Sequence, residues 1–354
     1  MNVLINVGPG IGDILQKLPM ASAVKAQYPD ANIDFLMWAN DPQNVKLNEQ
    51  ILECQNYVRN LYWYNVEYKL QCVKLLFQLR RNHYDFGFVR DGGLPQVRGF
   101  KPSFWIFRIM RWGGAKKVVG YMKDYVDIFA DVPETAHFIE RDRITLDAAG
   151  FTAPMTMKTI DESKLDFSFE NCDRLRESEK VIAFSVGTNS YLWTENGVTT
   201  VYDVKSWAYE KWIELSLRLA EKNIDVVLLG GNKEKRELEE KKISFPENNH
   251  IFNFIGRTNI KQSLAILSLC SFAVGAEGGM MHCASGLGVK TLTVFGGSDY
   301  RRWTPAGGDI VNLYLDCAPC FATKRGVYCK YHKCLEGIDV DMVFKRIMEL
   351  WSNG

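Results

Sequence analysis

Gly275–Gly288 reads GAEGGMMHCASGLG and lies between an apolar run, Ser271–Val274, and a β-prone run, Thr291–Phe295. Its glycines let the backbone turn sharply and approach a ligand closely. The residues after them can begin a helix, whose first amide N–H groups have no partner inside the helix. Such a helix start, at the carboxyl end of a parallel strand, binds phosphate readily. We therefore expect an anion-binding turn here, with His282 beside the amides.

Composition excludes several classes of protein. The 354 residues are enough for two domains of ordinary size, and 47% of them are hydrophobic, so burial is not limiting. Because 43 basic residues balance 42 acidic ones, nucleic acid is not expected as the main partner. We expect neither a transmembrane run nor a signal peptide. Nine mostly scattered cysteines favour a reducing, cytoplasmic setting.

The first half alternates β-prone runs with helical patterns, beginning with Val3–Val7, a glycine loop at Gly8–Asp13, a helical pattern and Ile33–Met37. That order is typical of a βαβ unit with a parallel sheet. The loop reads GPGIGD, not G-x-G-x-x-G, and no acidic residue closes the second run, so a nicotinamide-dependent dehydrogenase is disfavoured. Further strands and helices are expected at Val58–Trp63, Val66–Arg81, Phe86–Val89, Pro102–Arg111, Lys117–Gly120 and Ala136–Ala149.

Two acidic residues follow strands whose carboxyl ends would share one sheet edge, where clefts of α/β proteins form. Asp13 lies at the start of the first helix, and the local sequence favours a cap of that helix over a role in the cleft. Asp91 follows Phe86–Val89 and could line the same cleft, although a solvated turn is the more common arrangement.

Aromatic and basic residues are interleaved before and within Pro102–Arg111. Most such aromatics belong to cores, but the pattern also fits a platform for an amphiphilic or anionic acceptor at a membrane face. The residues concerned are Phe100, Lys101, Phe104, Trp105, Phe107, Arg108, Arg111 and Trp112.

A charged stretch without periodicity, at about residues 165–178, predicts a domain boundary. A second α/β domain follows, and several of its β-prone runs end in a glycine or a glycine pair. One such end is common, but several at one edge of a parallel sheet indicate a nucleotide site with backbone contacts. Its predicted elements are Val181–Ser185, a long polar insertion before Lys205, Tyr209–Lys222, Asp225–Leu229, Lys233–Lys242, Phe252–Ile255, Ile260–Leu269 and Val340–Leu350.

Several motifs together carry a family resemblance: Gly10–Asp13 followed by Pro19, Lys205–Trp207, Leu228–Gly231, Phe254–Thr258, and Gly275–Leu287 followed by Phe295-Gly296 and Arg302-Trp303. On these motifs the chain resembles family 9 of the glycosyltransferases, the lipopolysaccharide heptosyltransferases, from end to end. It departs from the family pattern at Ala276-Glu277, where Asn-Asp is usual, and at Gly278, where Ser or Thr is usual. Glu277 keeps the charge but reaches one methylene further. These departures affect the predicted identity of the donor more than the predicted reaction class.

The resemblance implies an α/β protein of GT-B architecture, with two Rossmann-like parallel-sheet domains that face each other across a cleft. Residues 1–170 would bind the acceptor, residues 171–338 the nucleotide sugar, and residues 339–354 would form a helix that packs back across both domains. It further implies inverting transfer without a catalytic metal. A general base then takes the proton of the acceptor hydroxyl as this attacks the anomeric carbon, and a cation stabilises the departing diphosphate.

In this resemblance Asp13 matches the general base, and Lys205 is the cation beside the leaving phosphates. Gly10, Gly12 and Asp91 would lie on the acceptor side. Glu234 would bind the nucleotide ribose, with a surface glutamate as an equal alternative, and Glu277 would contact the sugar or orient the turn. The remaining donor-binding residues would be Thr188, Gly231, Gly278, Gly279, Met280, Met281 and His282.

A cysteine cluster near the end of the chain, Cys317-x2-Cys320-x8-Cys329-x4-Cys334 with His332 inside it, has spacing compatible with a tetrahedral zinc or iron site. The cluster resembles clusters at the same place in members of the family, so it need not indicate a new function. Four ligands in so short a stretch favour a structural metal. The alternative is a set of reduced thiols in a cysteine-rich loop.

The leading hypothesis from the sequence is transfer of heptose from ADP-heptose to a lipopolysaccharide core or related glycan, with peripheral contact to the inner membrane left open. One alternative keeps the fold but glycosylates a protein. Another is a non-catalytic nucleotide-sugar-binding relative, against which Asp13, Lys205 and His282 argue.

Overall fold

The computed structural model describes residues 1–39, 42–65, 67–89, 102–188, 191–195, 198–321 and 323–352. It contains two compact units, Met1–Asp161 and Glu162–Gly354. The charged stretch at residues 165–178 belongs to the second unit and holds the short helix α6 (Cys172–Glu177), preceded by a 3-10 turn at Glu162–Lys164. Among the described residues, no helix is long and apolar enough to cross a membrane.

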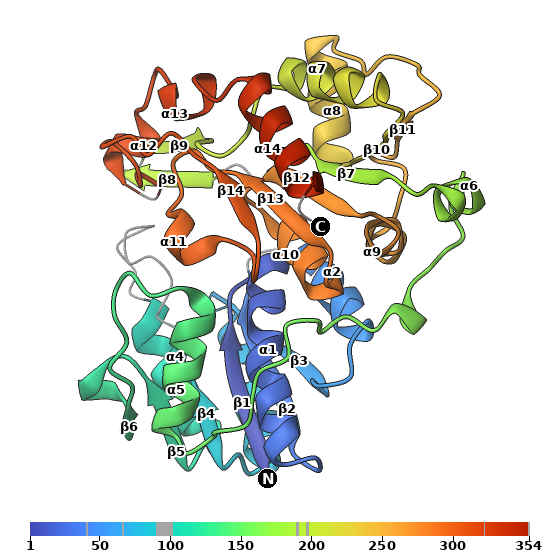
Figure 1. Ribbon diagram of the computed structural model, residues 1–354. Helices are drawn as coiled ribbons and strands as arrows, with labels where there is room; N and C mark the ends of the chain where they lie inside the picture. The colour runs from blue at the N-terminus through green and yellow to red at the C-terminus, as the bar shows by residue number, and fades with distance from the viewer. Residues whose placement is uncertain are drawn as a thin grey trace. The chain divides into compact units, whose positions relative to one another are not determined.

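The first unit is built on one parallel sheet with the strand order β3-β2-β1-β4-β5-β6 (Figure 1). This is the doubly wound order, and its direction reverses between β1 and β4, where such sheets bind ligands at the carboxyl ends of the strands. The strands are β1 (Asn2–Val7), β2 (Asn32–Trp38), β3 (Asn60–Tyr64), β4 (Phe86–Phe88), β5 (Lys117–Gly120) and β6 (Ile128–Phe129).

The described residues of this unit include five α-helices, of which the last follows β6: α1 (Ile11–Gln27), α2 (Pro42–Glu53), α3 (Lys69–Arg81), α4 (Pro102–Trp112) and α5 (Phe138–Ala148). Sequence periodicity predicted four of them but missed α2, which buries only Val45, Asn48 and Ile51. Such a sparse apolar face gives a weak periodic signal. The position of Pro42 at the helix start, where proline is favoured, was the available clue.

The second unit repeats the architecture with the strand order β11-β10-β7-β12-β13-β14, again all parallel. The two sheets confirm the predicted α/β fold of two Rossmann-like domains. The strands are β7 (Val181–Ser185), β10 (Asp225–Leu229), β11 (Ile251–Asn253), β12 (Phe272–Ala276), β13 (Lys290–Val294) and β14 (Asp309–Val311). The helices are α7 (Tyr209–Ala220), α8 (Asn232–Lys241), α9 (Ile260–Ser268), α10 (Gly279–Leu287), α11 (Tyr300–Trp303), α12 (Lys324–Val327), α13 (Lys333–Glu336) and α14 (Val340–Ser352).

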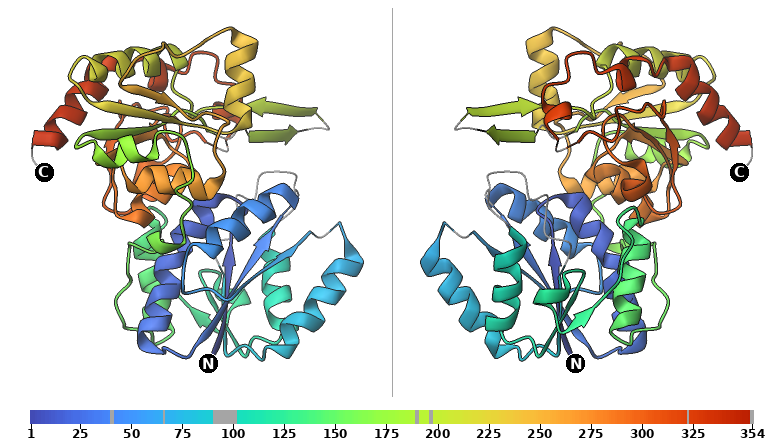
Figure 2. Two further views of the ribbon diagram at one scale, coloured as in Figure 1. Left: turned by 90° about the vertical axis from the view of Figure 1, so that its right-hand side faces the viewer. Right: turned by 90° about the vertical axis from the view of Figure 1, so that its left-hand side faces the viewer.

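The predicted polar insertion forms an antiparallel hairpin, β8 (Tyr191–Glu195) and β9 (Val198–Tyr202), which projects from the second unit (Figure 2). Its threonine and valine residues favour a strand, although they offer no continuous apolar face to predict one. The hairpin joins Thr188 to Lys205, so it separates two predicted site residues in sequence.

The last helix, α14, packs within the second unit against α7 and β14. Val340, Val343 and Ile347 are its buried face. Trp351 stacks on Phe272 of β12 with ring centroids 5.6 Å apart. A path of this helix across the first unit stays a prediction.

A buried carboxylate holds the outer strands of the first sheet together. Asp34 lies in β2, is fully buried and accepts hydrogen bonds from Arg59 Nε at 3.0 Å and Nη2 at 2.6 Å. Tyr84 Oη donates to the same carboxylate at 2.6 Å, and Asn60 Nδ2 of β3 donates at 3.0 Å. Since every contact is charge-assisted, the carboxylate is well compensated for its burial.

Replacing this carboxylate should weaken the first unit. We expect Asp34→Asn to lower the free energy of unfolding by roughly 2–4 kcal/mol, because the Arg59 guanidinium and the Tyr84 hydroxyl lose their anionic partner. Urea denaturation followed by circular dichroism measures the change. Asp30→Asn, at an exposed position, is the control and should stay within about 0.5 kcal/mol of the wild type. Equal stability of both variants would contradict the assignment.

Candidate functional site

The glycine turns of the second unit lie at the carboxyl ends of adjacent strands. β10, β7 and β12 are neighbours in the sheet and lead into Gly230-Gly231, Gly187-Thr188 and Glu277-Gly278. Because the strands are parallel, these ends share one edge, where α/β proteins bind ligands. The structure thus places the predicted donor-binding turns at one edge, referred to below as the donor edge.

Helix α10 begins at the donor edge. Gly278 precedes it in extended backbone, so α10 starts directly after the turn. Gly275 of β12 lies so close to this helix that a Cβ on it would approach the Met281 sulfur to 2.6 Å. The absence of a side chain at Gly275 therefore lets the helix start lie tightly against the strand.

The first turn of α10 is exposed only at its beginning. Gly279 and Met280 are partly exposed, whereas the Met281 and His282 side chains are buried. The amide of Met281 donates to the carbonyl of Gly278 at 3.2 Å. The accessible start of α10 is therefore formed by Gly279 and Met280, and a donor contact of Met281 or His282 stays a prediction.

A buried ion pair lies next to this helix start. Lys205 Nζ binds Glu277 Oε2, and the two side chains are only 7% and 10% exposed. Ser298, which follows β13, donates its hydroxyl to the same Glu277 oxygen at 2.7 Å. Because Glu277 directly precedes Gly278, the pair ties the Lys205 ammonium to the residue that precedes the cap of α10. A buried charge pair is costly unless it is compensated, so this one suggests a functional role.

The ring of Phe321 covers Lys205. The ammonium lies 4.4 Å from the ring centroid, a cation–π distance. The amides of Cys320 and Phe321 both donate to the carbonyl of Gly297 at 2.8 Å. A Cβ on Gly297 would lie 2.9 Å from the Cys320 sulfur, so the glycine allows this close approach. The cysteine-rich segment therefore helps to fix the position of the lysine.

The loop that carries Lys205 is held by Asp203. Its Oδ1 accepts the amides of Lys205 at 2.8 Å and Ser206 at 3.0 Å. The Ser206 hydroxyl in turn lies 2.9 Å from that of Thr188. The hydroxyl of Thr188 and the ammonium of Lys205 are thus tied to one loop, although a hairpin separates them in sequence.

Trp207 anchors the same loop in the core. Its indole is buried, packs edge-on against Trp212 at 4.7 Å, and donates to the carbonyl of Ile338 at 2.9 Å. Within the Lys205–Trp207 motif the tryptophan is therefore an anchor that holds the loop carrying the lysine.

Glu234 is buried, which excludes the alternative of a surface glutamate. It is 8% exposed, and its Oε2 accepts the amide of Gly231 at 2.7 Å. A Cβ on Gly187 would lie 2.2 Å from its Cγ, so this turn needs glycine to accommodate the glutamate. Glu234 therefore caps the start of α8 and packs against the turn after β7. A contact with a ribose stays a prediction.

In the first unit, Asp13 occupies the first turn of α1. Its Oδ2 accepts the amide of Gly10 at 3.0 Å, and its side chain is partly exposed. This hydrogen bond confirms that Asp13 caps the start of the helix. A carboxylate has further acceptor sites, so the cap does not prevent a second role. Gly10 and Gly12 lie in the same loop, whereas Asp91 lies outside the described residues.

The aromatic residues of the predicted platform differ in burial: of those whose side chains the structure describes, only Phe107 is buried, and Trp105 is partly exposed. Phe107, like the neighbouring Ile106, is buried, whereas Trp112 and Arg108 are exposed. Phe100 and Lys101 lie outside the part of the chain that the structure describes.

The cysteine cluster brings its thiols close enough for electrostatic interaction. Burial and the neighbouring thiols raise the pKa of Cys320 to about 11, and burial also raises the pKa of Cys334. Cys317 is exposed and Cys329 is partly exposed. Within the described ranges, no group of three or more His, Cys, Asp or Glu side chains is arranged to hold a metal ion. The described side chains therefore do not support the predicted zinc or iron site.

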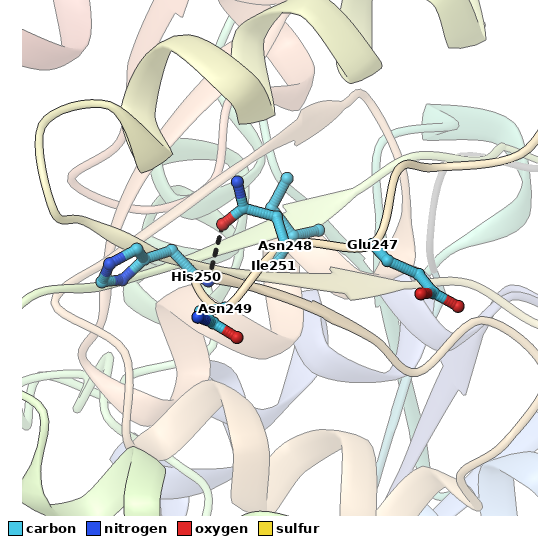
Figure 3. Close-up of a pocket in the computed structure, with 5 residues that line it drawn as sticks. All are labelled: Glu247, Asn248, Asn249, His250 and Ile251. Carbon is cyan, nitrogen blue, oxygen red and sulfur yellow. Dashed lines mark hydrogen bonds between the residues drawn. The ribbon is translucent and has the colours of Figure 1, made fainter.

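A surface pocket elsewhere is lined by residues 247–251 (Figure 3). Asn248 Oδ1 accepts the His250 amide there at 2.8 Å, and His250 Nδ1 lies 2.7 Å from Asp225 Oδ1. Asp225 and Ile251 begin β10 and β11. The pocket thus lies at the amino ends of the strands, the edge opposite to the donor edge.

Sequence reasoning missed three residues of the donor edge. Ser298 follows a glycine pair at a strand end, so the pattern that indicated the other turns could have found it. Asp203 lies two residues before Lys205, a spacing typical of a turn in which aspartate accepts backbone amides. Phe321 has no local signal, because its role depends on packing between distant segments.

Comparison with known proteins places the chain in a family. The model of glycosyltransferase family 9 (heptosyltransferase) matches residues 73–330. Lipooligosaccharide heptosyltransferase 2 of Haemophilus influenzae is 23% identical, with 99% of each chain covered. The enzyme of the same name from Campylobacter jejuni is 24% identical over 197 residues, and this match spans 57% of that protein's length and 54% of this chain.

The fold also matches a solved structure. The Escherichia coli heptosyltransferase WaaC, solved with ADP-2-deoxy-2-fluoro heptose, superposes with a TM-score of 0.69 at 15% identity over 99% of both chains. This likeness confirms the predicted GT-B fold. With most of its length matched by the family model, the chain belongs to glycosyltransferase family 9, the heptosyltransferase family.

Proposed function

We propose that this chain is an inverting glycosyltransferase that moves heptose from ADP-heptose onto a lipopolysaccharide core without a catalytic metal. The observation that carries the proposal is the buried pair of Lys205 and Glu277 beside the first turn of α10. Family membership and relatives named lipooligosaccharide heptosyltransferase 2 support the reaction class. A neighbour of the same fold was solved with an ADP-heptose analogue, which supports the donor.

In the proposed donor complex, the diphosphate meets the amides at Gly279 and Met280 and the ammonium of Lys205. Amides at a helix start carry partial positive charge, and a buried cation acts strongly because water does not screen it. Both stabilise the negative charge that grows on the departing ADP. The sugar hydroxyls would compete with Ser298 and Lys205 for the Glu277 carboxylate.

Asp13 is the proposed general base. Its carboxylate takes the proton of the acceptor hydroxyl while the hydroxyl oxygen forms the new glycosidic bond to the anomeric carbon. The bond from that carbon to the ADP oxygen breaks on the opposite face, and the configuration inverts. The contact with Gly10 orients the carboxylate and keeps one acceptor site of the group occupied.

Removing the base should abolish turnover but not donor binding. Asp13→Asn keeps an oxygen that can accept the Gly10 amide, so we expect the fold to persist while kcat falls by about 100- to 10,000-fold. The Kd for ADP, measured by calorimetry, should change by less than about threefold. Glu140→Gln in the first turn of α5 is the matched control. Wild-type turnover in Asp13→Asn would refute the assignment of the base.

The ion pair is tested by a double substitution. Lys205→Met leaves the buried Glu277 carboxylate without its cation, so we expect a lower melting temperature and a kcat/KM reduced by about 100- to 1,000-fold. In Lys205→Met/Glu277→Gln the uncompensated charge is gone, so stability should recover while turnover does not. Recovery of turnover together with stability would show that Lys205 acts only in the fold.

The acceptor is tested by offering the wild-type protein a purified lipopolysaccharide core and a protein acceptor with radiolabelled ADP-heptose. Transfer to the core supports the proposal, and transfer to the protein alone replaces it with the alternative. Absence of transfer from any nucleotide sugar would favour a non-catalytic binder.

A further inference from the structure

Helix α3 of the first unit exposes an apolar stripe. Leu75 and Leu79 are buried, whereas Leu70, Val73 and Phe77 are 81%, 50% and 63% exposed. Residues separated by three or four positions lie on the same face of a helix, so the exposed three form one continuous row. Large apolar side chains in such a row on a soluble surface indicate an interaction site.

The same helix is strongly basic. Lys69, Lys74, Arg80 and Arg81 are all exposed, and α3 contains no acidic residue, although Glu67 lies just before it. At 100° per residue, Lys74 and Arg81 lie on one side of the exposed row, and Lys69 and Arg80 lie on the other. The chain as a whole has a net charge of only +1, so this concentration of positive charge is local.

An exposed aromatic residue adjoins the carboxyl end of this helix. A Cβ on Gly113 would lie 3.0 Å from Leu79 Cδ1, so the end of α4 packs against the end of α3. Trp112 is 49% exposed there, with the guanidinium of Arg108 5.8 Å from its ring centroid. Tryptophan is favoured at the interface between lipid and water, and arginine can lay its stem on apolar surface while its charged group stays in water.

We propose that the exposed face of α3 docks onto an anionic lipid surface, with Leu70, Val73 and Phe77 entering the boundary between headgroups and acyl chains. The basic residues beside the row then contact anionic headgroups. A helix that is apolar on its exposed face and flanked by cations lies in the plane of such an interface. The helix has 13 residues, so it lies on the bilayer rather than crossing it.

Charge distinguishes a lipid surface from a second copy of the chain. A two-fold contact through this face would place the four cations of α3 against the same four on the partner, and like charges repel. Anionic headgroups instead complement them, each cation near the surface adding to the attraction. Because no step of sugar transfer enters this argument, the docking can be measured independently of the proposed activity.

The test is co-flotation of the full-length protein with vesicles of phosphatidylcholine, with or without about 30% phosphatidylglycerol. We expect binding to the anionic vesicles, weakened by salt because added ions screen the headgroup charge. Leu70→Gln/Phe77→Gln and, separately, Lys74→Glu/Arg81→Glu should each reduce the partition coefficient by about tenfold or more. Leu217→Gln/Met342→Gln, which alters exposed apolar residues of the second unit, is the matched control and should bind like the wild type.

Circular dichroism and ADP binding establish that each variant is folded. The proposal is overturned if the wild type does not bind anionic vesicles, or if the α3 variants bind as well as the control. It is also overturned if light scattering shows a dimer that the α3 substitutions dissociate, since the row would then be a self-association face. Loss of transfer activity in an assay with normal vesicle binding would count against the proposed function alone.

Discussion

The donor edge depends on keeping one lysine ammonium charged inside the protein. Lys205 is compensated by the Glu277 carboxylate and by the ring of Phe321, and its backbone is fixed by Asp203. Burying an ion costs free energy that only close partners can offset. The ammonium therefore ties together segments that are distant in sequence, from the turn after β12 to the cysteine-rich loop.

Much of the architecture could be predicted, because parallel strands and glycine turns leave local signals. Apolar runs that end in glycines predicted the βαβ unit at the start of the chain. They also predicted the strands at Val181–Ser185 and Asp225–Leu229 and the glycine turns at their carboxyl ends. Helix α2 and the β8–β9 hairpin did not follow, since neither has a continuous apolar face. Their existence depends on packing against the sheet and on pairing between strands.

The sequence motifs predicted several residues of the site but not the contacts between them. Motifs indicated Lys205 and Glu277 separately, yet nothing local shows that the two side chains pair, or that Ser298 and Phe321 complete the group. Such contacts join segments far apart in sequence. The metal site predicted from the cysteine spacing is not supported, because the described side chains are not arranged as a ligand set.

Nucleotide binding by the wild-type protein tests the central claim most directly, because a ligand that binds only the native state raises the melting temperature. Thermal unfolding should be followed with ADP, AMP, GDP and UDP at equal concentrations. A diphosphate held by Lys205 and the start of α10 predicts that ADP stabilises most and that AMP, which lacks the second phosphate, stabilises clearly less. Equal stabilisation by ADP and AMP, or none by either, would contradict the account.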